Sequence, residues 1–118
     1  EKTSNGITPL SALDINGYLE IDDGDFDAAT FTHTVAGDFI TAGGTFTQNT
    51  STINFDGGST QAVNVTTAGG TTPNTATINF YNLTASGSDV RIYYDVSTNK
   101  VNVLNDLTIS GKLINIEK

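Results

Sequence analysis

The 118-residue sequence contains no cysteine, no methionine and no tryptophan, and it has only two prolines. Without cysteine, a disulfide framework, thiol redox chemistry and cysteine-ligated zinc or iron–sulfur sites are all excluded. Basic residues are also scarce, because five Lys and Arg stand against 13 Asp and Glu and give a formal net charge of −8. Since a surface that follows phosphates needs cations, nucleic acid is excluded as a partner.

Long apolar runs are missing as well. No stretch approaches the roughly 18 apolar residues of a transmembrane helix, so we expect no membrane insertion. The length suits one domain. Because the first residue is Glu1 and methionine is absent, we expect the sequence to be a processed product or a segment of a longer protein.

Four small or polar residue types dominate what is present. The counts are 20 Thr, 12 Asn, 12 Gly and eight Ser, together 52 of 118 residues. Disordered chains of such composition are poor in aromatic and β-branched residues, whereas this one has six Phe, four Tyr and regularly spaced Val and Ile. These residues favour strands, so the composition predicts an all-β fold.

A short pattern, apolar-x-apolar-x-Gly-x-apolar, returns along the chain. It is found as LDINGYL at 13–19, HTVAGDF at 33–39, INFDGGS at 53–59 and LTISGKL at 107–113. The first two steps are equal, from position 13 to 33 and from 33 to 53, and they align Leu13 with His33 and Ile53, Gly17 with Gly37 and Gly57, Gly24 with Gly44, and Phe26 with Phe46. A further copy, INFYNLT at 78–84, follows after a longer step from 53 to 78, with the extra length assigned to a loop at 66–75.

A constant repeat made of short strands and glycine corners predicts a β-solenoid. We expect a right-handed parallel β-helix of about five coils, at 13–32, 33–52, 53–77, 78–106 and 107–118. The fourth coil holds additional strands at 90–94 and 100–104, whose inward residues are Val90, Ile92, Tyr94, Val101 and Val103. The alternative is an antiparallel β-sandwich, which does not explain the constant step.

Three phrases carry a family resemblance: GDFITAGGTFTQNTSTINFDGGSTQAV, INFYNLTAS and VNVLNDLTISGKL. Together they resemble the repeats of very large, adhesin-like secreted surface proteins of Bacteroidetes and related bacteria. The resemblance covers roughly residues 13–115 and implies a cell-surface or extracellular location. Residues 1–12 do not match, and we assign them as a cap, a linker or a docking segment.

The two ends of the repeat region carry the same motif, because LTISGKL near the C-terminus repeats LDINGYL near the N-terminus. A solenoid normally covers its end coils with a cap. We therefore expect residues 13–118 to continue into a neighbouring copy of the same chain, head to tail.

An acidic segment, IDDGDFDAA, offers a candidate metal site. Asp23, Asp25 and Asp27 hold positions 1, 3 and 5 of a calcium-binding loop, although position 6 is Ala28 and position 12 is Thr34. Calcium is the one cofactor that the sequence suggests, and solvated turn acids are the alternative. The single histidine, His33, falls in an inward column and is predicted to be a buried residue bonded to backbone.

Threonine pairs form the most ordered polar feature. Three Thr-x-Thr pairs are separated by the same steps as the repeat motif, which predicts a ladder of three rungs. The pairs are Thr30 with Thr32, Thr50 with Thr52, and Thr75 with Thr77. Such a ladder resembles the flat faces of ice-binding solenoids. Threonine is also an ordinary outward strand residue that stabilises neighbouring strands.

Aromatic residues could contact sugars. Tyr93 lies beside Arg91 and Asp95 on the presumed outer face, and Tyr81 and Tyr94 could stack on sugar rings. No convergent pair of acid and base residues stands out, so we expect no enzyme activity. The sequence predicts a structural module, a stalk or a filament unit, with a glycan-binding or surface-binding adhesin as the alternative and ice binding as a weaker one.

Overall fold

The computed structural model describes residues 6–63, 77–94 and 100–117, and this part of the chain consists of strands and turns. The strands are β1 (Gly6–Ile7), β2 (Asp14–Ile15), β3 (Leu19–Ile21), β4 (Asp25–Asp27), β5 (Thr32–Val35), β6 (Phe39–Thr41), β7 (Thr45–Thr47), β8 (Thr52–Phe55), β9 (Thr60–Val63), β10 (Ile78–Ala85), β11 (Asp89–Tyr94), β12 (Val101–Ile109) and β13 (Leu113–Glu117). Every pairing among them is parallel. The fold is therefore a parallel β-helix, and the antiparallel sandwich is wrong.

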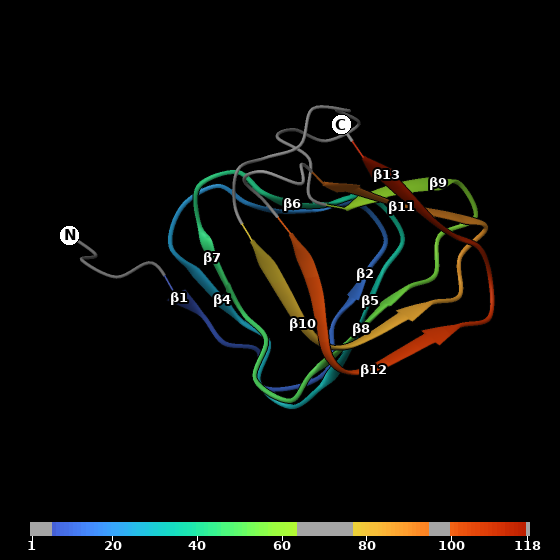
Figure 1. The fold of residues 1–118 in the computed structure, drawn as a ribbon. Coiled ribbons are helices and arrows are strands. Elements are labelled where there is room, and N and C mark those ends of the chain that lie inside the picture. Colours follow the sequence, from blue (N-terminus) through green and yellow to red (C-terminus); the bar gives the residue numbers. More distant parts are fainter. Residues whose placement is uncertain (1–5, 64–76, 95–99, 118) are drawn as a thin grey trace.

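The strands form three sheets that surround one interior. Sheet A has the order β1-β4-β7, sheet B has β2-β5-β8-β10-β12, and sheet C has β3-β6-β9-β11-β13. In Figure 1 sheet A lies on the left and sheet C at the top. The chain visits B, then C, then A, so β2 to β4 make coil 1 and β5 to β7 make coil 2. Coils 3, 4 and 5 begin at β8, β10 and β12.

Along sheet B the first three coils keep the constant step that the sequence predicts, whereas on sheet C the step into coil 3 is longer, because Phe39 pairs with Val63. His33 pairs with Ile53, and Val35 pairs with Phe55. Phe26 likewise pairs with Phe46, across sheet A. Like residues of successive coils stack because the strands pair in register, so the predicted columns on sheet B and the predicted pairing of Phe26 with Phe46 are confirmed.

The predicted alignment of coil 4 is wrong. Leu83, not Ile78, pairs with Ile53, so the step into this coil is longer than the sequence pattern predicts. The stretch INFYNLTA holds two short alternating runs, one with Ile78 and Phe80 buried and one with Leu83 and Ala85 buried, and the pattern can begin at either run. Gly87 decides between them, because it continues the corner of Gly57.

The last two coils are joined by a longer ladder with one irregularity. β12 combines the predicted strand at 100–104 and the LTI motif into one strand of nine residues. Between the pairs Phe80–Val103 and Asn82–Asp106 the register shifts, so Tyr81 on β10 faces two residues of β12. Beyond this bulge the ladder resumes, and Leu107 pairs with Leu83.

Phenylalanine fills the centre of the stack. Phe39, Phe55 and Phe80 are fully buried. The ring of Phe39 lies edge-on at 5.0 Å from that of Phe46 and at 5.2 Å from that of Phe80, measured between ring centroids. Edge-to-face packing of this kind adds about 0.5–1.5 kcal/mol per pair beyond burial. The predicted inward residues Val90 and Ile92 are also buried in this core, and only the backbone of Tyr94 is described.

A column of glycines lines the corner between sheets B and C. At Gly37 an added Cβ would lie 2.7 Å from the Gly17 carbonyl oxygen of the coil below. At Gly57 it would strike the Ala36 carbonyl, and at Gly111 the Gly87 carbonyl. These corners are glycine because backbone approaches backbone too closely for any side chain.

Candidate functional site

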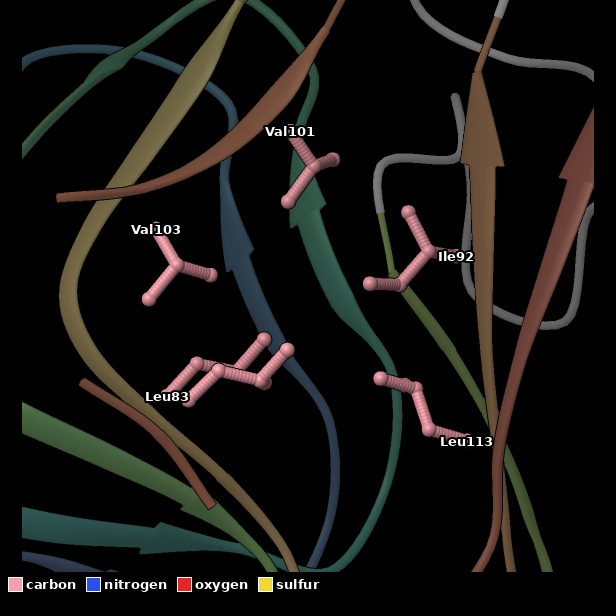
Figure 2. Close-up of a pocket in the computed structure, with 6 residues that line it drawn as sticks. Leu83, Ile92, Val101, Val103 and Leu113 are labelled. Atoms are coloured by element: carbon pink, nitrogen blue, oxygen red, sulfur yellow. The ribbon is translucent and has the colours of Figure 1, made fainter. Parts of the chain in front are cut away.

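The C-terminal end of the stack opens into an apolar hollow. Its volume is about 290 Å³, and it is lined by Leu83, Ile92, Val101, Val103, Leu107 and Leu113. Figure 2 shows the side chains that it labels pointing toward a common space from β10, β11, β12 and β13. All six residues belong to the inward columns of coils 4 and 5, and an apolar hollow of this kind is a candidate binding surface.

The hollow exists because coil 5 has no coil above it among the described residues. Leu83 of coil 4 is 1% exposed, whereas its column neighbour Leu107 is 50% exposed. Ala85 is fully buried, whereas Ile109 is 52% exposed. Inward position alone therefore does not bury a side chain, because burial also needs a neighbouring coil on each side.

Strand edges are free at the same end. Among the described residues, β12 and β13 each pair on one side only, with β10 and β11. At the opposite end, β2 and β3 likewise pair on one side within the described chain. An unpaired strand edge with apolar side chains is a template for pairing with another chain.

The predicted threonine ladder forms in part. Thr32 and Thr52 are register partners on the outer face of sheet B. The next rung is Asn82, not Thr77, because the register of coil 4 differs from the predicted one. Thr77 is exposed just before β10, and Thr75 lies outside the described residues.

The other two predicted ladder residues belong to turns. Thr30 and Thr50 are exposed, and each follows a residue with positive φ, Ala29 at 52° and Asn49 at 43°. They occupy equivalent corners of coils 1 and 2 and add no rung to the strand ladder.

Polar side chains on the outer face of sheet B bond to one another. The side-chain amide of Asn82 donates to the Thr52 hydroxyl at 3.1 Å, and the side-chain amide of Asn105 donates to the side-chain oxygen of Asn82 at 2.8 Å. The Thr34 hydroxyl donates to Asp14 at 3.0 Å. These bonds link successive coils, so the face stabilises the stack as well as presenting polar groups to solvent.

The predicted calcium loop does not form. Asp25 and Asp27 alternate with buried Phe26 on β4, so both point outward, and Asp23 accepts a hydrogen bond from Gly24 N–H on the preceding turn. Asp27 accepts instead from Ala29 N–H at 2.7 Å. Within the described residues, no group of three or more His, Cys, Asp or Glu side chains is placed to hold a metal ion.

His33 is a core residue, as predicted. It is fully buried, and its Nδ1 accepts from the Leu13 N–H at 3.1 Å. Nε2 therefore carries the proton and donates to the Ala28 carbonyl at 2.9 Å. Both ring nitrogens are used in holding coils 1 and 2 together.

Sequence reasoning missed Gln61, which is fully buried in the corner of coil 3. Its side-chain nitrogen donates to the carbonyls of Val35 at 2.6 Å and Gly37 at 3.0 Å. Its oxygen accepts from Gly57 N–H at 2.8 Å. The sequence carried no signal for it, because the pairing of Gln61 with inward Val90 depends on the coil 4 register that the structure reveals.

The predicted patch around Tyr93 is rearranged. Tyr93 is only 5% exposed and packs with Ile40 and Ala62 on the outer side of sheet C, so its ring is not open to a sugar. Arg91 pairs with Asp89 at 2.7 Å, while Asp95 lies outside the described residues. The hydrogen bond from Arg91 lowers the pKa of Asp89, and Asp89 in turn raises the pKa of Arg91.

Comparisons with known proteins identify no relative. No protein-family model, no curated protein and no solved structure matches the sequence or the fold of this chain. In the part of the chain that the structure describes, no helix is long and apolar enough to cross a membrane.

Proposed function

We propose that the chain is a non-catalytic structural module of an extracellular bacterial surface protein or fibre, acting as a stiff stalk or as a unit of a self-assembling filament. One observation carries the proposal. Successive coils are joined in register along sheets B and C by five-stranded parallel ladders, and along sheet A by three strands. Bending such a stack requires several ladders to shear at once, so the module keeps its shape under load.

The use of buried polar residues supports this role. His33 and Gln61, the two largest buried polar side chains, both bond to backbone groups of other coils. A buried hydrogen-bonded group of this kind fixes the register of the stack. The interior therefore serves packing and register, which are the requirements of a scaffold.

The extracellular location rests on two sequence features. One is the resemblance of residues 13–115 to repeats of secreted bacterial surface proteins, and the other is the acidic, cysteine-free composition with a net charge of −8. An excess of negative charge keeps a protein soluble and opposes nonspecific association.

Antibody labelling tests this function. An antibody raised against the chain is applied to intact and to permeabilised cells of the source organism, with a known cytoplasmic protein as control. We expect label on intact cells, and rod-like or fibrous projections in negative-stain images. Label that needs permeabilisation would contradict the proposal.

An adhesin module is the second candidate, and the outer face of sheet B favours it. Thr34, Asn54 and Thr84 are partners in adjacent strands and present hydroxyl and amide groups in a row. A glycan array probed with the whole chain separates the two functions, because specific binding that Thr84→Val weakens would favour the adhesin. Ice binding loses its support, since Asn82 interrupts the threonine row.

A further inference from the structure

The two free ends of the stack are complementary in direction. In the part of the chain that the structure describes, coil 5 has unpaired edges at β12 and β13, and coil 1 has unpaired edges at β2 and β3. Because all strands are parallel, the strand edges of coil 5 that face away from the stack are equivalent to the edges of coil 4 that pair with coil 5. We propose that coil 5 of a second copy docks on coil 1 of the first copy, with Leu107 against Leu13 and Gly111 against Gly17. This names the partner of the structural module proposed above and rests on that function.

The two coils carry the same motif at the positions that would meet. The matched pairs are Leu107 with Leu13, Ile109 with Ile15, Gly111 with Gly17 and Leu113 with Leu19. On the C-terminal side Leu107 and Ile109 are half exposed, and on the N-terminal side Leu13 is only partly buried. Docking at the usual strand spacing of about 4.8 Å would continue the sheet B columns that end at Leu107 and Ile109, and it would bury both sets of side chains.

Gly17 is the sharpest sign of a missing coil. Gly37, Gly57, Gly87 and Gly111 are glycines whose added Cβ would strike backbone of the coil below. Gly17 holds the same corner of coil 1, yet an added Cβ there meets no atom within 4 Å. Gly17 also lacks the positive φ that would require glycine, since Gly24 is the glycine with positive φ in the described chain. A docked coil 5 supplies the reason, because the Gly111 corner of the second copy would occupy that space.

β1 supplies a second sign. It pairs with β4 of coil 1 through Gly6–Asp25 and so lies one level below coil 1 on sheet A. Strands at that level on sheets B and C are absent from the described residues. In the proposed register, β12 and β13 of the second copy take these two places, so that one coil is completed by strands of two copies.

The same register gives exposed Tyr18 a partner. Tyr18 is 56% exposed and follows Gly17, while exposed Lys112 follows Gly111. Docking sets the Tyr18 ring beside the Lys112 ammonium, an arrangement worth a fewfold change in affinity at exposed sites. Since the interface joins two different surfaces and does not close, it generates a filament.

Two variants block one end each. Leu107→Asp places a charge in the hollow at coil 5, where the side chain is already half exposed. Gly17→Val fills the space below the Gly17 corner, where the isolated chain has no atom within 4 Å. Ser59→Asp adds the same negative charge at an exposed turn on the side of the stack and serves as the control. Circular dichroism checks that all three fold.

Sedimentation velocity of the whole chain, up to about millimolar concentration, reads out the docking. We expect the wild type and Ser59→Asp to form oligomers of increasing length with concentration, and each end variant alone to stay monomeric. A mixture of Leu107→Asp and Gly17→Val retains one good end of each kind and should form dimers that grow no further. A monomeric wild type, an end variant that still associates, or a mixture that stays monomeric would overturn the interface. If the chain is monomeric in solution but the antibody labels intact cells, the interface is refuted and the extracellular structural function is retained. Failure of the interface can therefore be distinguished from failure of the proposed function.

Discussion

The middle and the ends of this stack share an inward leucine position and a glycine corner, and at these positions they differ in what lies above and below. Leu83 is 1% exposed and Leu107, its partner in the next coil, is 50% exposed. Gly37 would clash with backbone if it gained a Cβ, whereas Gly17 would not. In a solenoid, therefore, the neighbouring coil determines whether an inward side chain is buried and whether a corner must be glycine. An inward leucine or a corner glycine at an end of the stack thus indicates the kind of coil that would pack against it.

The largest expected difference lies in the aromatic core. Phe80→Ala removes a fully buried ring that contacts Phe39, Phe46 and Phe55, so we expect the free energy of unfolding to fall by about 3–5 kcal/mol. Leu107→Ala at the open end should cost about 1 kcal/mol or less, because half of that side chain is already in water. Urea unfolding of dilute protein measures both, and equal losses would contradict the distinction between middle and end.

The corner glycines sharpen the comparison at the level of the backbone. In Gly87→Ala the new Cβ would lie 2.8 Å from the Gly57 carbonyl oxygen, and we expect a loss of about 1–3 kcal/mol from this overpacking. Gly17→Ala, in the same corner of coil 1, should leave the stability of the monomer unchanged or slightly raised. Thermal unfolding of the pair checks this, and a large loss at Gly17 would mean that its corner is constrained within the monomer.

Gln61 and Ser51 are both buried and polar, but the side chain of Gln61 forms hydrogen bonds and the hydroxyl of Ser51 has no hydrogen-bond partner among the described residues. Gln61→Ala leaves the Val35 carbonyl and the Gly57 N–H without their partner, and we expect a loss of about 2–3 kcal/mol. The Ser51 hydroxyl is buried and has no hydrogen-bond partner among the described residues, so Ser51→Ala should be neutral or stabilising. Chemical unfolding compares them, and a similar loss in both would refute the bonding role of Gln61.

The smallest expected effect lies on the outer surface of coil 4. Because Arg91 lowers the pKa of Asp89 in the folded chain, the pair contributes stability above the unfolded pKa of 3.8 and loses it as the pH falls through the folded pKa. Asp89→Asn should therefore be slightly less stable than wild type at pH 7 and equal to it at strongly acidic pH. Unfolding curves from strongly acidic to neutral pH test this, and a pH-independent difference would argue against the ion pair.

The sheet B columns of the first three coils could be predicted because one constant step repeats and its glycines coincide. The frame of coil 4 could not, because INFYNLTA contains two alternating runs and the corner at Gly87 selects the second, which gives the longer step. The calcium prediction counted sequence spacing, while Phe26 sets the parity of β4 and turns its neighbours outward. The sequence predicts an exposed Tyr93, but the side chain is buried, because it packs with Ile40 and Ala62 in a small apolar cluster on the outer side of sheet C.

The proposed docking requires that the outer edges of β12 and β13 in coil 5 pair with a second copy of the chain. Amide hydrogen exchange measures this pairing. Exchange is measured in β12 and β13, and for comparison in β8 and β10, at low and at high protein concentration. If a second copy pairs with the free edges, exchange in β12 and β13 slows as the concentration rises while β8 and β10 stay unchanged. Exchange in β12 and β13 that is independent of concentration would contradict the account.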